Sequence, residues 1–301
     1  MNFKFSIIIP SYNEGEDIRL AIESAIAQNY PEKEILVVDD STDQTRNIIK
    51  EYESSGVKLI EGKKIGCCGA RNLGIKLATG DVIVLLNADV ILPPDFLARI
   101  KKHYEAGADY ILVESEVFNQ ESLWARFIEA QHCFEYRHRD DIEWTEGFSC
   151  RRQAALQVGG IPGEYSLTFC RDWLLGKKLG QAGFKKVIDR SIVVTHKAPA
   201  TFAEYWRVRK ARGRFAALGQ YYIWNKSLPL LFLKFIIKDI ISASRFLLVL
   251  PVSWRVLQIS LRSPHQLKDF LPFWGGFFIQ ELAQRLGEWQ GWLMAAQHRV
   301  S

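Results

Sequence analysis

The residues best suited to chemistry interrupt an apolar stretch, VIVLLNADVILPP, at positions 82–94. The run Val82–Leu86 has the length and β-branched content of a strand that is buried on both faces. It places Asn87 and Asp89 beyond the carboxyl end of that strand, where open α/β sheets bind their ligands. A carboxylate there can hold a cation. The structural alternative is an Asx turn in which Asp89 bonds its own backbone.

Polar residues also follow the first two predicted strands. The loop Ser11–Glu14 comes after FSIIIP, and Asp39 and Asp40 come directly after ILVV. A carboxylate after the second strand of such a sheet commonly accepts hydrogen bonds from base or ribose hydroxyls. We therefore expect these groups to converge on one end of the sheet.

The motifs that usually hold phosphates are absent from the sequence. The first crossover reads PSYNEGED, without GxGxxG, which disfavours a dinucleotide oxidoreductase, and no GxxxxGKS or GxxxxGKT segment supports a P-loop ATPase. A diphosphate would then need a bound divalent cation and a basic side chain. Asp89 is the candidate for the first role, and Arg71, in the glycine-rich segment GCCGARN, for the second.

Strand and helix patterns alternate through the first ~115 residues, as in a parallel sheet wrapped by helices. The expected strands lie at residues 5–10, 35–38, 57–60, 82–86 and 110–113. Thr42 or Asp43 is expected to cap a helix that runs to Tyr52, and Gly80 to end the helix after GCCGARN. Further on, we expect helices at 123–139 and 173–183 and a strand at 192–195.

The carboxyl-terminal third is basic and apolar. Residues 197–301 contain 15 Lys or Arg and 5 Asp or Glu. The segment Leu228–Val252 is long enough to span a bilayer, but Lys234, Lys238 and Arg245 fall within roughly 40° of one another on a helix. Because such charges are costly inside hydrocarbon, we predict a helix in the headgroup plane. The alternative is packing onto the catalytic core.

Other features of the sequence bear on partners and location. A second apolar piece, Phe270–Ile279, is too short to span a membrane alone and suits interfacial placement. The basic tail also fits nucleic acid, but its long apolar runs argue against that partner. The five cysteines form no CxxC pair, and MNFKFSIIIP lacks the features of a signal peptide. A reduced, cytosol-facing compartment is therefore expected.

An ordered series of motifs resembles family 2 of the glycosyltransferases, which are inverting and have the GT-A fold. IIIPSYNE, ILVVDDSTDQT, GARNLGIKLATGD and VIVLLNADVILPPD carry the resemblance, and EGFSCRRQAALQVGGIPGEY, CRDWLLGKKLGQAGF and VVTHKA extend it more weakly. The resemblance implies an α/β fold with a mostly parallel nucleotide-binding sheet flanked by helices. We expect a catalytic domain at residues 1–222 and a helical, membrane-associated region at residues 223–301.

The resemblance also assigns roles to individual residues. The substrate-binding residues that it implies are Pro10, Tyr12, Glu14, Asp39, Asp40, Arg71 and Asn87. The first three would line the base and ribose of the nucleotide, and the two aspartates would hydrogen-bond the same groups. Arg71 would approach the base or the diphosphate.

The resemblance further implies a metal site and a catalytic base. Asn87-Ala88-Asp89 matches the DxD motif, whose last carboxylate binds Mn²⁺ or Mg²⁺ on the nucleotide diphosphate. His196 matches a histidine that can complete the metal shell, although a histidine after a strand is an ordinary surface residue about as often. Asp172 matches the general base, and its alternative role is to favour the first turn of a helix.

Two positions depart from the family pattern. Asn87 replaces the first carboxylate of DxD and brings no charge, so the metal would depend more on Asp89 and His196. Arg171 replaces the acidic neighbour of the base, and a cation there would lower the pKa of Asp172 and make it a weaker base. In the alternative, Arg171 points away along the start of the helix.

The function expected from the sequence is metal-dependent, hexosyltransferase-type transfer from a UDP-, GDP- or dTDP-sugar to a hydroxyl acceptor. The acceptor is expected to be a lipid-linked glycan or a nascent polysaccharide, reached by a peripheral or monotopic enzyme at the cytoplasmic face of the membrane. The alternative is a catalytically weak nucleotide-sugar-binding protein of the same fold. No nucleic acid partner is expected.

Overall fold

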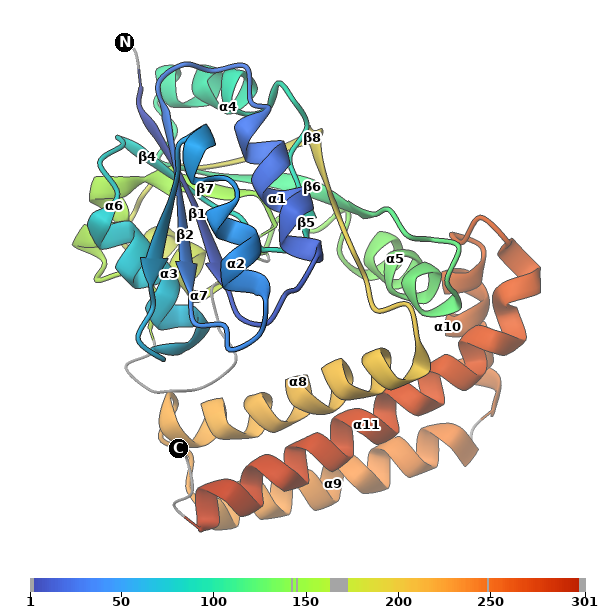
Figure 1. Ribbon diagram of the computed structural model, residues 1–301. Helices are drawn as coiled ribbons and strands as arrows, with labels where there is room; N and C mark the ends of the chain where they lie inside the picture. Colours follow the sequence, from blue (N-terminus) through green and yellow to red (C-terminus); the bar gives the residue numbers. More distant parts are fainter. Residues whose placement is uncertain (1–2, 142, 145, 163–172, 248, 298–301) are drawn as a thin grey trace. The chain divides into compact units, whose positions relative to one another are not determined.

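The computed structural model describes residues 3–141, 143–144, 146–162, 173–247 and 249–297, without the side chains of residues 245–247. The chain divides into two compact units: unit 1 (residues 1–116 and 140–196) and unit 2 (residues 117–139 and 197–301). Figure 1 shows that the sheet belongs to unit 1 and that unit 2 is built from helices. Because packing alone defines these units, a catalytic domain that ends at residue 222 stays a prediction.

Unit 1 contains an eight-stranded sheet in the order β3-β2-β1-β4-β7-β6-β8-β5. Its strands are β1 (Phe5–Ser11), β2 (Lys33–Asp39), β3 (Val57–Glu61), β4 (Val82–Leu85), β5 (Val90–Ile91), β6 (Tyr110–Val117), β7 (Phe148–Arg151) and β8 (Lys186–His196). The first four strands in the order are parallel, whereas β7 is antiparallel to β4 and β6, and β5 to β8. The predicted α/β class is confirmed, with a mixed sheet.

Helices cover both faces of the sheet (Figure 1). All seven residues of β1 are buried, which explains its continuous apolar run. On one face, Ile7 and Ile9 share a core with residues of α1 (Asp17–Ile26), α2 (Thr45–Lys50) and α4 (Phe96–Glu105). On the other, Ile8 shares a core with residues of α3 (Gly66–Leu77), α6 (Arg152–Gln157) and α7 (Trp173–Gln181). A short 3₁₀ helix, η1 (Glu53–Ser55), follows α2.

Several predicted helix ends are wrong, including the start of α2 and the end of α3, and a tertiary contact explains the second of these. The helix α2 begins at Thr45, after Gln44, and the Asp43 carboxylate accepts a hydrogen bond from the Thr45 N–H (3.0 Å). The helix α3 ends at Leu77. Gly80 instead allows a close approach to β1, because a Cβ there would lie 2.7 Å from the Lys4 carbonyl oxygen.

Unit 2 consists of helices that pack around their own apolar clusters. They are α5 (Leu123–Glu135), α8 (Phe202–Tyr222), α9 (Leu228–Leu247), α10 (Val249–Ser260), η2 (Gln266–Asp269) and α11 (Phe270–Ala296). Thr201 and Glu204 form a capping box at the start of α8. The backbones of α8 and α11 approach closely: a Cβ on Gly287 would lie 2.0 Å from the Lys210 carbonyl oxygen.

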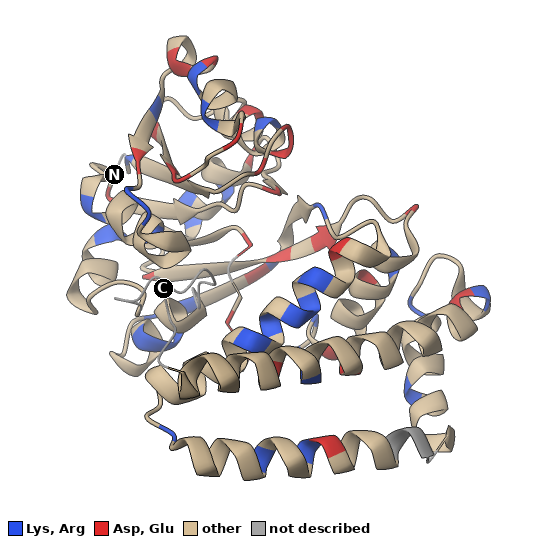
Figure 2. Ribbon diagram, turned by 60° about the horizontal axis from the view of Figure 1, so that its bottom comes forward, with Lys and Arg blue, Asp and Glu red and all other residues tan. Residues whose placement is uncertain are grey.

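Three charged residues of α9 form hydrogen bonds to neighbouring helices of unit 2. Lys238 Nζ lies 2.9 Å from Glu288 Oε1, and Trp289 Nε1 donates to Asp239 Oδ2 (2.6 Å). Lys234 hydrogen-bonds Gln220 on α8. Figure 2 shows basic residues along α8 and in the middle of α9. Both lysines of the predicted basic stripe therefore contact neighbouring helices, Lys234 at an exposed position and Lys238 at a partly exposed one; the Arg245 side chain lies outside the described residues.

Much of the exposed surface of α9 is apolar. Leu233, Ile237 and Ile240 are 56%, 47% and 63% exposed. The apolar segment predicted at residues 228–252 comprises α9 and the start of α10, and the segment predicted at 270–279 opens the 27-residue α11. Within the ranges described, we find no helix that combines the length and apolarity required to cross a membrane.

Candidate functional site

The loops that follow β1 and β2 are joined by hydrogen bonds. The Asn13 N–H donates to Ser41 Oγ (2.8 Å), and Asn13 Oδ1 accepts from the Thr42 N–H (2.8 Å). Asn13 has a φ of 55°, a left-handed conformation that asparagine tolerates. Ser41 Oγ donates in turn to Asp39 Oδ1 (2.5 Å). The two loops consequently form one polar surface at the carboxyl ends of adjacent parallel strands.

Asp39 and Asp40 organise this surface in different ways. Asp39 is fully buried, and Arg46 Nε donates to its Oδ2 (3.0 Å). Asp40 is partly exposed and accepts hydrogen bonds from the N–H groups of Lys64 (2.7 Å) and Gly66 (3.3 Å). Both carboxylates thus hold loops together in the free protein, and of the two only Asp40 presents exposed surface to a ligand.

The three predicted base-site residues after β1 differ in exposure. Pro10 is buried, Tyr12 is 57% exposed and Glu14 is partly exposed. Burial raises the pKa of Glu14 to about 7, and the carboxylates of Asp89 and Asp17 contribute to the rise. Mutual repulsion of this kind marks a place where a cation would be stabilised.

Arg71 and Asn87 contact each other. Arg71 is buried on α3, and its Nη2 donates to Asn87 Oδ1 (2.5 Å) while its Nη1 contacts Cys67 Sγ. Because Asn87 is neutral, this hydrogen bond orients the guanidinium without neutralising its charge. An oriented guanidinium is well suited to a diphosphate.

Asp89 and His196 are brought together by the pairing of β5 with β8. In that antiparallel pair, Val90 lies opposite His196, and Asp89 immediately precedes Val90. Burial raises the pKa of Asp89; His196 acts to lower it, and the nearby carboxylate of Glu146 acts to raise it further. The sequence placed these residues 107 positions apart, and the sheet joins them.

The donor set fits a hard divalent cation that keeps ligands from its substrate. Within the described ranges, no group of three His, Cys, Asp or Glu side chains is arranged to hold a metal ion. Mg²⁺ characteristically takes one or two protein carboxylates and completes its shell with phosphates and water. Asp89 and His196, with the carboxyl groups of Glu14 and Glu146 nearby, are compatible with that mode.

The predicted catalytic base lies outside the described residues. Arg171 and Asp172 both fall in the range 163–172. The role of Asp172 therefore stays a prediction.

The sequence analysis assigned no individual role to some polar residues of the site. Asn13 and Ser41 connect the loops after β1 and β2, and Glu146 acts on Asp89. Ser11 Oγ, at the end of β1, is buried without a hydrogen-bond partner in the described part of the chain; such groups are uncommon. Glu146 begins the motif EGFSC, a signal that could have identified it.

The fold and the site define a class: an α/β protein with a basic and acidic cluster at the carboxyl ends of parallel strands. The chain belongs to glycosyl transferase family 2, whose family model matches residues 6–160. The resemblance predicted from the motifs is thereby confirmed, including the GT-A fold. The matched range holds the residues predicted to bind substrate and Asp89, but ends before His196.

Curated relatives match part of the chain. It is 33% identical over 133 residues to the Escherichia coli UDP-Glc:alpha-D-GlcNAc-diphosphoundecaprenol beta-1,3-glucosyltransferase WfgD. The aligned residues cover 43% of this chain and 53% of WfgD. It is 36% identical over 112 residues to the succinoglycan biosynthesis protein ExoO of Rhizobium meliloti, covering 36% of this chain and 32% of ExoO. The chain thus matches about half, or less, of the length of these relatives.

Solved structures share the fold across the whole chain. The mannosyltransferase PcManGT from Pyrobaculum calidifontis, in complex with GDP-Man and Mn²⁺, has a TM-score of 0.56 at 20% identity, covering 100% of this chain and 77% of PcManGT. S. aureus TarS 1-349 has a TM-score of 0.52 at 16% identity, and the match covers 98% of this chain and 92% of TarS 1-349. At these identities the likeness establishes the fold alone.

Proposed function

We propose that the protein transfers a sugar from a nucleotide-diphosphate sugar to a hydroxyl group, with inversion at the anomeric carbon. Membership in glycosyl transferase family 2 supports this proposal. The observation that carries it is the meeting of Arg71, Asn87, Asp89 and Glu14 beyond the carboxyl ends of parallel strands. Open α/β sheets bind nucleotides at that end.

In the proposed donor complex, the polar loops hold the nucleoside. Tyr12 offers an exposed ring to the base, with Pro10 and Glu14 beside it. Asp39 and Asp40 provide acceptors for base or ribose, Asp39 after a change in its present hydrogen bonds. Arg71, oriented by Asn87, binds the diphosphate.

Asp89 and His196 are the residues that would hold Mn²⁺ or Mg²⁺. When bound, such an ion neutralises charge on the departing diphosphate. Glu14 keeps a further carboxyl group close to Asp89; its raised pKa means that a bound cation would favour its ionised form.

Asp172 is the proposed base. The acceptor oxygen forms a bond to the anomeric carbon as the bond between that carbon and the diphosphate oxygen breaks. Asp172 takes the hydroxyl proton, and the nucleoside diphosphate leaves with the electron pair. A single displacement of this kind inverts the anomeric centre.

The proposed setting is the synthesis of a polysaccharide or lipid-linked glycan. WfgD and the E. coli protein WfaP are both named as UDP-Glc:alpha-D-GlcNAc-diphosphoundecaprenol glucosyltransferases, so UDP-glucose with a lipid-linked GlcNAc diphosphate is the first pair to test. We place the enzyme at the cytoplasmic face of the membrane as a peripheral or monotopic protein. Exposed hydrophobic side chains on α9, α10 and α11 support this location.

Donor turnover tests the proposal. Release of nucleoside diphosphate is measured from UDP-, GDP- and dTDP-sugars with Mn²⁺, with Mg²⁺ and with a chelator. We expect metal-dependent turnover of one donor, at least about a hundredfold slower in Asp172→Asn because proton removal fails. Donor affinity should stay within about twofold, since this carboxylate acts on the acceptor.

Two further results decide between the candidate functions. Asp89→Asn should lose metal-dependent turnover, whereas Asp95→Asn, an exposed control at the start of α4, should behave as the unaltered chain. Donor binding without turnover in the unaltered chain would favour the catalytically weak binding protein instead. The neutral Asn87, already engaged by Arg71, is the feature that makes this alternative worth testing.

A further inference from the structure

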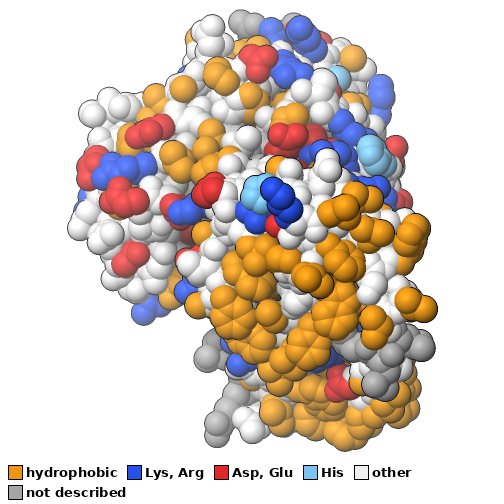
Figure 3. Space-filling view, turned by 90° about the vertical axis from the view of Figure 1, so that its right-hand side faces the viewer, with side chains coloured by type: hydrophobic (Ala, Val, Ile, Leu, Met, Phe, Trp, Pro, Cys, Tyr) orange, Lys and Arg blue, Asp and Glu red, His pale blue; other side chains and the backbone are white. Residues whose placement is uncertain are grey.

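The turn between α10 and α11 exposes large hydrophobic side chains. We call residues 249–271 the α10–α11 elbow. Leu250 and Leu271 are 83% and 76% exposed, the two highest values among the described large hydrophobic residues that lie at the surface, and Trp254 and Leu267 follow at 63% each. Figure 3 shows hydrophobic side chains gathered over helices of unit 2 in the lower part of the view. Exposed apolar patches of this kind mark interaction sites.

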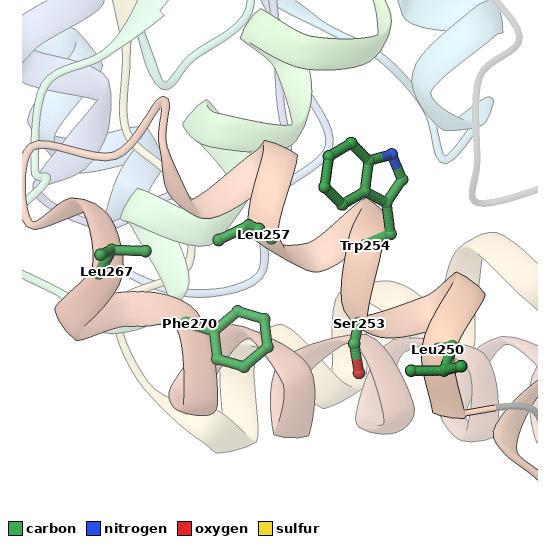
Figure 4. A pocket seen from close by; sticks show the side chains of 6 residues that line it. All are labelled: Leu250, Ser253, Trp254, Leu257, Leu267 and Phe270. Atoms are coloured by element: carbon green, nitrogen blue, oxygen red, sulfur yellow. The ribbon is translucent and has the colours of Figure 1, made fainter.

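An apolar hollow of about 380 Å³ lies within the elbow. Its lining comes from α10, η2 and the first residue of α11, and Figure 4 shows these side chains: Leu250, Ser253, Trp254, Leu257, Leu267 and Phe270. Ser253 is the only one of the six that carries a hydroxyl group. The hollow therefore suits hydrocarbon.

The charges of the elbow are almost entirely positive on its surface. Arg255, Arg262 and Lys268 are exposed, and Arg255 forms an ion pair with Glu135 on α5 (2.6 Å). The single acidic residue between positions 249 and 271, Asp269, is 2% exposed. An apolar surface with basic residues at its border is complementary to anionic lipid headgroups above acyl chains.

A buried ion pair fixes the shape of the elbow. Arg126 on α5 donates to both carboxylate oxygens of Asp269, from Nε (2.9 Å) and from Nη2 (3.0 Å). Ser263 Oγ also donates to Asp269. Meanwhile, Val256 and Ile259 on the inner side of α10 are fully buried in the core of unit 2. The outward hydrophobic side chains thus stand on a fixed scaffold.

We propose that the α10–α11 elbow inserts into the surface of an anionic phospholipid bilayer, with acyl chains filling its hollow. The inference rests on the proposed function, since it names the part of the chain that contacts the membrane. A second copy of the chain is the competing occupant. A two-fold symmetric contact through the elbow would bring the same cations, Arg262 and Lys268, toward their counterparts, and their repulsion disfavours that arrangement.

Binding of the full chain to vesicles tests the proposal. Co-sedimentation is measured with phosphatidylcholine alone and with equal parts of phosphatidylcholine and phosphatidylglycerol. We expect binding to the mixed vesicles that weakens about tenfold in Leu250→Gln and again in Leu271→Gln, because each removes a leucine from hydrocarbon. Glutamine has nearly the helix propensity of leucine, so both exposed positions should keep the fold.

Matched variants distinguish binding through the elbow from non-specific adsorption through other exposed leucines. Leu77→Gln on α3 and Leu293→Gln near the end of α11, both about half-exposed, should bind like the unaltered chain. Arg262→Gln with Lys268→Gln should weaken binding to the mixed vesicles and abolish most of its salt dependence. Quenching of tryptophan fluorescence by lipids with brominated chains should fall in Trp254→Phe.

Several results would overturn the inference. Equal loss in Leu77→Gln, or no loss in Leu250→Gln and Leu271→Gln, would exclude the elbow as the contact. A concentration-dependent dimer in sedimentation that is lost in Leu250→Gln would assign the surface to a second copy. If vesicle binding fails while a soluble acceptor is still glycosylated, the membrane inference fails and the proposed function stands. If the chain binds vesicles but turns over no donor, the membrane inference stands and the proposed function fails.

Discussion

The contact between Arg71 and Asn87 is the most informative residue-scale feature of the site. A carboxylate at position 87 would pair with the guanidinium, whereas the amide only orients it. The substitution that removes a negative charge from the metal motif therefore leaves the charge of Arg71 undiminished by residue 87. In the proposed donor complex, this arrangement shifts diphosphate binding from the metal toward Arg71.

Asn87→Asp tests this balance. We expect the Mn²⁺ concentration for half-maximal donor turnover to fall about tenfold, because a second carboxylate joins Asp89. KM for the donor should rise severalfold, because Arg71 would be held in an ion pair. Titrations of metal and of donor measure the two effects, with Asn29→Asp, at an exposed position before β2, as control. Unchanged metal and donor titrations would remove residue 87 from the site.

The sequence predicted the residue types of the site better than their present contacts. Asp89 and His196 were paired by family resemblance; Asp89 directly precedes β5, whose Val90 lies opposite His196 on β8. The burial of Asp39 against Arg46 and the link from Asn13 to Ser41 were not predicted. These contacts depend on the geometry of two loops from different strands, which no local sequence pattern encodes.

At the scale of elements, Glu34 connects the amino-terminal half of β1 with the loop before β4. The carboxylate on β2 is buried and accepts hydrogen bonds from Ser6 Oγ (2.6 Å), from the Thr79 N–H (2.7 Å) and from Lys58 Nζ (3.1 Å). Burial alone would raise the pKa of Glu34, but the hydrogen bonds outweigh it and lower the pKa from 4.5 to about 2. The ionised form therefore stabilises the sheet.

A pH series of unfolding experiments follows from that pKa. Because the folded state lowers the pKa, the stabilisation is fully present above pH 4.5 and is lost as the pH falls toward about 2. Glu34→Gln should reduce the free energy of unfolding at neutral pH by about 3 kcal/mol, with a difference that shrinks in acid. Urea unfolding measures it, and the exposed Glu53→Gln should change nothing. A loss independent of pH would contradict the assignment.

The elements that sequence patterns predicted are those with continuous or periodic apolar character. The strands β1, β2 and β4 were predicted because buried strands read as apolar runs. The two-residue β5 and the six-residue α6 are too short to show a period. The predicted end of α3 was wrong because Gly80 is needed for a close backbone approach to β1 rather than for ending the helix.

For the whole molecule, the division into two units was beyond local patterns. The helix α5 follows β6 in the chain but packs in unit 2, where Arg126 pairs with Asp269 across 143 positions. Each unit has apolar clusters of its own. We therefore expect that a substitution in the core of unit 2 can destabilise that unit while unit 1 still binds the donor.

Gly287→Ala tests this independence. The added Cβ would meet the Lys210 carbonyl oxygen at 2.0 Å and the Arg214 backbone nitrogen at 2.8 Å, so α8 and α11 would have to separate. We expect unit 2 to lose about 1–3 kcal/mol of stability, while a nucleoside diphosphate still raises the melting temperature of unit 1. Gly275→Ala on the same helix is the matched control, because its Cβ meets nothing within 4 Å and alanine favours a helix.

Thermal unfolding with and without nucleotide, followed by limited proteolysis, distinguishes the units. Simultaneous loss of nucleotide protection in Gly287→Ala would mean that the units fold as one, and equal behaviour of the two variants would mean that the α8–α11 contact yields more readily than its geometry implies.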